Sequence, residues 1–427
     1  MAALFRGRYR YVIALLLFAA ATINYIDRQS ISIAERELKR EFALTPQQYG
    51  DILSWFFLAY AIGQIATGWV VDRIGARKGF TIAVAFWSVA NMAHALGTGV
   101  RSFSALRFGL GLFEAANYPA ALKAISQWFP KAERSTAVGL VNAGVGFGAI
   151  VAGPFVAWLI LTAGWRGAFL LTGALGLFWL VFWLLLYGSP ETHPAVTDEE
   201  RRLIATDAVA IGHGERSTLW SLLQRRETWG LMLSRFVADG AFYFFATWLP
   251  KYLGDIRGLS LSQIGWMVSI PFIAADLGSV AGGFAGTALI RRGFSIDASR
   301  KLLMWAGALL VPVSLLALEA ETPIQALLWI GVGMFGIQVK SASLFTVPAD
   351  IFTSQDLGLA WGLSGAAGSY GGSLFAPLVG YLVAHHSYTP VFWIVSVMHI
   401  LSCLIVMLFL PKIGEARTSP PTKEELA

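Results

Sequence analysis

Long apolar stretches, separated by short polar segments, follow one another through the whole chain. Each stretch of about 20 residues is long enough to cross a bilayer as a helix. A β-barrel is disfavoured, because its strands alternate apolar and polar residues over about ten positions. The pattern predicts twelve spans, at about 11–35, 47–71, 78–98, 103–127, 135–160, 167–187, 229–253, 262–289, 301–319, 323–347, 357–384 and 388–410.

One long polar segment divides these spans six and six. It contains the run Asp198-Glu199-Glu200-Arg201-Arg202, which predicts a short amphipathic helix. We therefore expect an all-α membrane protein with two pseudo-symmetric six-helix bundles, a plan in which the site lies between related halves. The predicted domains are an N-terminal bundle, a cytoplasmic linker, a C-terminal bundle and a cytoplasmic tail, at 1–187, 188–228, 229–411 and 412–427.

Composition and charge support this prediction. The 427 residues are 56% hydrophobic and 14% charged, against about 25% charged residues in soluble domains. The net charge of +6 does not indicate nucleic-acid binding, because the basic residues gather in short loops between spans. Of 32 Lys and Arg, 20 fall on the side that holds both termini and 7 on the other, which predicts cytoplasmic termini. The N-terminal apolar run continues through Asp27 and Arg28, so an uncleaved first span is favoured over a signal peptide.

Charges that interrupt predicted spans of the first half include Asp27 and Arg28 in the first span and Arg107 and Glu114 in the fourth. A charge at the bilayer centre costs about 2.5–3.5 kcal/mol on insertion scales, so such residues face a bundle interior and pair with one another. Glu114 follows Arg107 by two helical turns, about 10 Å along one face, whereas Asp27 and Arg28 point about 100° apart. The pattern favours a proton relay beside an anion site over a static ion network.

The loop after the second span has glycine, acidic and basic residues at fixed spacing: Gly68, Asp72, Arg73, Gly75, Arg77 and Lys78. This pattern resembles the loop motif of the major facilitator superfamily. The run Arg107-Phe108-Gly109-Leu110-Gly111 and the glycine-rich segment 144–154 resemble its fourth-helix and fifth-helix motifs.

Within that superfamily, Asn24-Tyr25-Ile26-Asp27-Arg28 resembles the anion:cation symporters, and 247–253 (TWLPKYL) resembles bacterial hexuronate transporters. The resemblance implies a proton-coupled symporter in the bacterial inner membrane, expected as a monomer. It would import a sugar acid by alternating access, and the expected sugar acid is a hexuronate such as glucuronate or galacturonate. Its partners would be the organic anion, protons and the lipid bilayer. We expect no enzymatic activity, no cofactor, no metal and no nucleic acid.

The resemblance also implies roles for individual residues. Asp27, Glu114 and Arg107 would couple protons, with Asp27 expected to meet Arg107. Arg28 would hold the substrate carboxylate, because a guanidinium matches it as a bidentate fork. Further substrate contacts are expected from Tyr25, Tyr60, Asn117, Ser369 and Tyr370, and conformational gating from Asp72, Arg73, Arg77 and Lys78.

Several alternatives remain open. The same machinery would carry an aldonate, glucarate or an aromatic acid, and the same fold serves exporters. A membrane-embedded enzyme or receptor is disfavoured, because the sequence contains no Walker A loop, HExxH or GxSxG motif. Four charges of the second half are open between a structural and a substrate-side role: Arg235, Asp239, Asp276 and Lys340.

Overall fold

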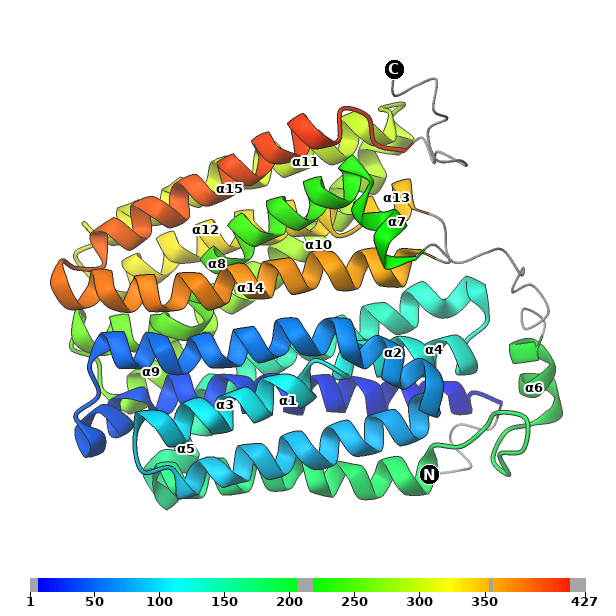
Figure 1. Cartoon of the computed structure of the whole chain (residues 1–427), viewed down its shortest axis with the longest axis horizontal. Coiled ribbons are helices and arrows are strands. Elements are labelled where there is room, and N and C mark those ends of the chain that lie inside the picture. Colours follow the sequence, from blue (N-terminus) through cyan, green and yellow to red (C-terminus); the bar gives the residue numbers. More distant parts are fainter. Residues whose placement is uncertain (1–6, 206–217, 353–355, 415–427) are drawn as a thin grey trace.

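The computed structural model describes residues 7–205, 218–352 and 356–414, whose regular structure is helical. Figure 1 shows the helices running side by side in two bundles. The N-terminal bundle contains α1 (Tyr9–Phe42), α2 (Pro46–Ala93), η1 (His94–Leu96), α3 (Val100–Glu114), α4 (Asn117–Trp128) and α5 (Lys131–Leu186). The C-terminal bundle contains α8 (Arg226–Asp255), α9 (Leu261–Met267), α10 (Ser269–Arg291), α11 (Ile296–Leu310), η3 (Val311–Ala317), α12 (Pro323–Leu344), α13 (Val347–Ile351), α14 (Leu357–His385) and α15 (Thr389–Phe409).

Two of these helices, α2 and α5, each consist of two helical segments joined at a glycine. We call each such membrane-length helical segment a rod. The backbone leaves the helical conformation at Gly75 in α2 and at Gly164 in α5, with φ of 81° and 72°. Glycine adopts this left-handed region without the steric penalty of a side chain. Eight described segments are long and apolar enough to span a membrane, and one of them, Thr136–Leu186, contains the turn at Gly164. With α3–α4, α8 and α14 they give the twelve rods that the sequence predicts.

Broken helices recur at equivalent places in the two bundles. The fourth rod breaks between α3 and α4, just before Pro119, and the tenth breaks between α12 and α13, just before Pro348. Proline lacks the N–H that would bond the carbonyl four residues earlier. For Pro119 that carbonyl belongs to Ala115, and the Thr67 hydroxyl donates a hydrogen bond to it with a donor–acceptor distance of 3.4 Å. The matching breaks agree with the two pseudo-symmetric bundles expected from the sequence.

The two bundles meet along a contact surface that we call the seam. It consists of α2 against α14, which lie side by side in Figure 1, of α5 against α9 and α10, and of α1 against α8. The first two contacts are equivalent under the exchange of the bundles. In the first, the second rod (in α2) meets the eleventh (α14), and in the second, the fifth rod (in α5) meets the eighth (α9–α10). The seam is where residues of both halves can reach one ligand.

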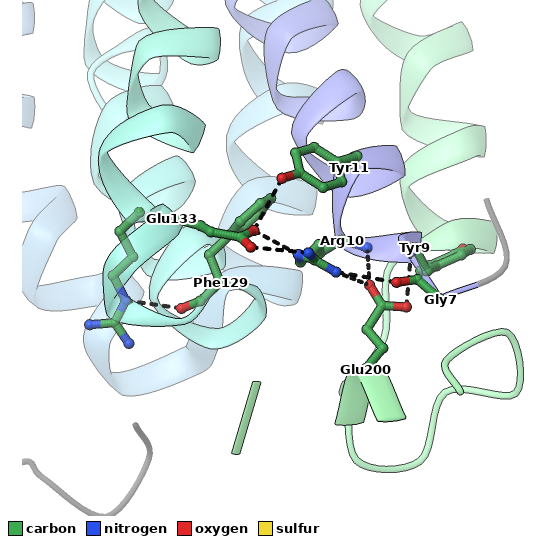
Figure 2. A network of polar contacts seen from close by, with 8 residues as sticks. Gly7, Tyr9, Arg10, Tyr11, Phe129, Glu133 and Glu200 are labelled. Carbon is green, nitrogen blue, oxygen red and sulfur yellow. Dashed lines mark hydrogen bonds and ion pairs between the residues drawn. The ribbon is translucent and has the colours of Figure 1, made fainter. Parts of the chain in front are cut away.

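The linker predicted from the sequence contains the expected short helix, α6 (Asp198–Ala205), and a second one, α7 (Leu219–Leu223). Figure 2 shows how α6 is fastened to the N-terminal bundle. The Glu200 carboxylate accepts hydrogen bonds from the backbone N–H groups of Tyr9 and Arg10, both at 3.0 Å. These N–H groups open α1 and have no partner within the helix, so Glu200 acts as its cap. The Arg10 guanidinium then joins Glu200 to Glu133 at the start of α5.

Candidate functional site

The charges predicted inside the spans are buried at the centre of the N-terminal bundle. Asp27 and Glu114 have no exposed surface, and Arg107 is 1% exposed. Only Arg28 is partly open, with 17% of its side chain exposed. We call these four residues the charge cluster.

Asp27 and Arg28 point to different partners, as their 100° separation predicts. The Asn91 amide donates to Oδ1 of Asp27 at 2.7 Å and to Oγ1 of Thr172 at 2.8 Å. Arg28 donates from Nε to Oε2 of Glu114 at 3.1 Å. Asp27 is therefore tied to the second rods of α2 and α5, whereas Arg28 is tied to α3.

The expected contact between Asp27 and Arg107 is not made, and that prediction is wrong for this conformation. Arg107 donates from Nη2 to the backbone oxygen of Arg28 at 3.3 Å, and its guanidinium lies 4.4 Å from the centre of the Phe56 ring. Asn91 takes the place beside the Asp27 carboxylate that the arginine was expected to fill. Burial of a cation against a ring and a carbonyl replaces the direct ion pair.

Several atoms of the charge cluster are buried without a hydrogen-bond partner among the described residues. They are Oδ2 of Asp27, Oε1 of Glu114, and Nε and Nη1 of Arg107. A buried polar atom left unpaired costs about 1–3 kcal/mol. Such atoms can bond a proton, a water or a repositioned side chain, as expected of groups that change partners during a reaction cycle.

The break after α3 positions Glu114. Glu114 is the last residue of α3, and the chain turns at Ala115 and Ala116 before Pro119. The adjoining Asn117 is buried, and its side-chain oxygen has no partner among the described residues. Glu114 and the predicted contact residue Asn117 therefore lie beside a helix break, where the backbone is free of the regular helical pattern.

Aromatic rings surround Arg28. Its guanidinium carbon lies 4.6 Å from the centre of the Tyr60 ring, 5.3 Å from that of Phe56 and 5.5 Å from that of Tyr25. These contacts surround the cation with aromatic rings, and its partial exposure leaves part of it open to a planar anion. The structure thus brings two of the predicted contact residues, Tyr25 and Tyr60, to Arg28.

Ser369 reaches the seam, but its neighbour Tyr370 does not. The Gln64 amide donates to Oγ of Ser369 at 3.0 Å, across the seam, and the Tyr243 hydroxyl lies 3.4 Å from the same oxygen. Tyr370 is 46% exposed and lies beside Phe236. Consecutive residues of a helix point about 100° apart, so the two cannot share a face.

The four charges of the second half form no single network. Arg235 pairs with Asp239 at 2.8 Å, and Lys340 donates to Oγ of Ser402 at 2.6 Å. Asp276 is half-buried, and a side chain at Gly146 of α5 would collide with its carboxylate. Asp276 therefore lies on the seam, whereas the Lys340 ammonium bonds a residue of α15 in its own bundle.

The basic residues of the loop at Gly75 contact their own bundle. The Arg73 guanidinium lies 3.6 Å from the centre of the Trp69 ring, and Arg77 donates to the backbone oxygen of Leu184 at 2.9 Å. Lys78 is exposed, and the side chain of Asp72 lies outside the described residues. Neither described contact crosses the seam.

An ion network joins the bundles at the end away from α6 and α7. Lys251 of α8 bonds Glu35 of α1 at 2.7 Å and Asp255 at 2.8 Å, and Asp255 also bonds Lys39 at 3.3 Å. The Tyr49 hydroxyl donates to the backbone oxygen of Thr247 nearby. This end of the seam is closed, and we call the network the end lock.

Sequence reasoning missed the uncharged members of the site: Asn91, Thr172, Gln64 and Tyr243. It also gave Lys251 and Glu35 no role. A carboxamide inside an apolar span is a weaker signal than a charge, but Asn91 and Gln64 were visible as such.

Two helical bundles with charges buried between their helices define a membrane transport protein. The sequence model described as the Major Facilitator Superfamily matches residues 17–339 and 231–426, and the chain belongs to this superfamily. It is a multi-pass membrane transporter, not an enzyme, as the sequence predicted.

The chain is similar to three relatives over most of its length. It is 32% identical to the hexuronate transporter of Escherichia coli (strain K12), with 94% of each chain covered. It is 29% identical to the D-galactonate transporter of Escherichia coli O6:H1, over 94% of this chain and 96% of the relative. It is 30% identical to the probable galactarate/D-glucarate transporter GudP of Escherichia coli (strain K12), over 88% of each.

The fold is also that of a solved transporter. A crystal structure of a D-xylose-proton symporter superposes with a TM-score of 0.75 at 19% identity, covering 96% of this chain and all of the other. This likeness confirms the predicted fold class.

Proposed function

We propose that the chain is a proton-coupled symporter that imports a sugar acid, a hexuronate first, across the bacterial inner membrane. The observation that carries the proposal is the Arg28–Glu114 pair, a part-exposed guanidinium held by a fully buried carboxylate at 3.1 Å. The relatives support the substrate class, because their names give hexuronate, galactonate, galactarate and glucarate.

The pair suggests how proton and substrate are linked. A substrate carboxylate has the charge and shape of the Glu114 side chain, so the two compete for Arg28. Protonation of Glu114 weakens its hold on Arg28 and frees the guanidinium for the incoming anion. Asp27 offers a second proton site, because a buried carboxylate that accepts from the neutral Asn91 amide loses its desolvation penalty when it is protonated.

Coupling to protons solves an energetic problem. An inward-negative potential opposes entry of a lone anion by about 2.3 kcal/mol per 100 mV. One accompanying proton makes transport electroneutral, and two make it electrogenic in the favourable direction. With Asp27 and Glu114 the charge cluster offers two candidate proton sites.

The excess of basic residues at the end that holds α6 and α7 supports a cytoplasmic position for that end. We infer that the end lock is periplasmic. The structure then has the periplasmic end of the seam closed. The loop residues Arg73 and Arg77 would join the bundles in the opposite, outward-facing state.

Uptake of labelled glucuronate into proteoliposomes tests the proposal. We expect accumulation when the outside is acidic relative to the inside, and only equilibration without a gradient. Competition by unlabelled galactonate, glucarate and benzoate ranks the alternative anions. Uptake that ignores the gradient would rule out proton coupling, and no uptake of any sugar acid would rule out the substrate class.

A further inference from the structure

We propose that Arg235 and Asp239, with Gln64 and Ser369, form a second subsite that binds the uncharged end of the sugar acid and rejects a second carboxylate. The inference rests on the proposed function, because it places the substrate's carboxylate at Arg28. It adds a specificity determinant in the C-terminal bundle.

The pair has one unused donor. Arg235 donates from Nε and Nη2 to the same oxygen of Asp239, at 3.0 and 2.8 Å. Its Nη1 is buried and has no acceptor among the described residues. A buried guanidinium N–H without an acceptor is rare in a folded protein, and a ligand oxygen would satisfy it.

The pair lies beside the seam, next to the glycines Gly365 and Gly368 of α14. A side chain at Gly365 would collide with the Gln64 amide oxygen and lie 3.4 Å from Nη1 of Arg235. A side chain at Gly368 would collide with Oδ2 of Asp239. Gln64 of the N-terminal bundle and Arg235 of the C-terminal bundle thus both approach Gly365.

Spacing along α2 connects this place to the charge cluster. Tyr60, whose ring covers Arg28, and Gln64, which bonds Ser369, are four residues apart on one face. That separation is one helical turn, about 6 Å. In the proposed arrangement a six-carbon acid bridges the two places, with its carboxylate at Arg28 and its far oxygens toward Arg235.

The charge of the pair decides which far end is accepted. Asp239 neutralises Arg235 and would repel a carboxylate placed beside it, whereas the free N–H still bonds a hydroxyl or carbonyl oxygen. Hexuronates and aldonates, which have one carboxylate, satisfy both subsites. Aldarates such as galactarate have a carboxylate at each end and would be rejected.

Calorimetric titration of the purified full chain in detergent with glucuronate and galactarate tests the subsite. We expect the wild type to bind glucuronate at least about 10-fold more tightly. Asp239→Asn leaves the Arg235 charge uncompensated, and we expect it to shift the affinity ratio at least 10-fold toward galactarate. The matched control is Asp350→Asn, since Asp350 pairs with Arg300 at 2.9 Å with similar exposure, away from the seam.

A second variant guards against misfolding of the first. The double substitution Arg235→Leu with Asp239→Leu removes both charges and leaves none unpaired. We expect it to weaken glucuronate binding about 10- to 100-fold, the loss typical of one or two hydrogen bonds to a charged donor, without any gain for galactarate.

The outcomes separate the two claims. Wild-type binding of glucuronate with an unchanged ratio in Asp239→Asn, or with undiminished affinity in the double variant, would overturn the subsite alone. A wild type that binds neither acid would overturn the proposed function and the subsite with it.

Discussion

At Asp27 and Glu114, one oxygen of each carboxylate is hydrogen-bonded and the other is buried without a partner among the described residues. The two differ in what holds them: an amide for Asp27, an arginine for Glu114. In the proposed function the substrate competes for the arginine, whereas Asp27 keeps its bond from the Asn91 amide.

Asn91 tests the residue-level account. Asn91→Ala removes the donor to Asp27 and Thr172, so we expect it to lower the free energy of unfolding by about 1–3 kcal/mol at neutral pH. In Asp27→Leu, which has no carboxylate to satisfy, the same change should cost less. Thermal unfolding of the four proteins of this cycle in detergent measures the difference. Equal costs in both backgrounds would show that Asn91 does not hold Asp27.

At the scale of elements, breaks and caps position the site. Pro119 ends the regular helix just after Glu114, and Gly75 turns α2 back so that Asn91 reaches Asp27. The linker helix α6 is a second case, because Glu200 caps α1 and Arg10 extends the contact to α5. This clasp stabilises the bundle end rather than the site.

The clasp should respond to acid. The hydrogen bond from Arg10, together with its charge and the Tyr11 hydroxyl, lowers the pKa of Glu133 below its usual 4.5. A carboxylate with a lowered folded pKa contributes stability above its usual pKa and loses it as the pH falls through the folded pKa. At pH values above 5, we expect Glu133→Gln to lower the free energy of unfolding by less than about 1 kcal/mol, and the unfolding temperature slightly with it.

As the pH falls through the lowered folded pKa of Glu133, the unfolding temperatures of the wild type and Glu133→Gln should converge. Thermal unfolding from pH 7 to pH 3 measures this, with Glu227→Gln as the control, because its contact with Arg225 is long, at 3.8 Å. A difference that is independent of pH would contradict the assignment.

The fold and the site differ in how far the sequence predicts them. The boundaries of the rods follow from apolar length, and the observed helices start and end within several residues of the predicted spans. The membership of the charge cluster follows from the cost of burying Asp27, Arg28, Arg107 and Glu114. Its pairing does not, because the Asn91 amide competes with Arg107 for Asp27 only once α1 and the second rod of α2 are packed. The outward direction of Tyr370 likewise depends on how α14 is rotated.

At the scale of the whole molecule, the end lock closes one end of the seam, and Gln64 and Arg235 approach Gly365 of α14 farther along it. Alternating access requires the lock to open when the other end closes. The single cysteine, Cys403, is buried, so an introduced cysteine can report that opening with little background.

Weakening the end lock should favour the outward-facing state. The Ser54 hydroxyl donates to the backbone oxygen of Ser373 across the seam, so a cysteine at Ser54 is partly covered in the closed form. We expect Lys251→Met to speed labelling of Ser54→Cys by a water-soluble maleimide about 10-fold. Asp297→Asn, which breaks a pair within the C-terminal bundle, is the control. Unchanged labelling in Lys251→Met would show that the ion network does not hold the seam closed.

The measurement that tests the central claim most directly compares two kinds of glucuronate transport in proteoliposomes, for the wild type and Asp27→Asn. Proton-driven accumulation requires a titrating carboxylate, whereas counterflow exchange requires only substrate binding and alternating access. We predict that Asp27→Asn loses accumulation and retains counterflow. Accumulation at the wild-type level in Asp27→Asn would contradict proton coupling through this residue and leave the buried carboxylate a structural role.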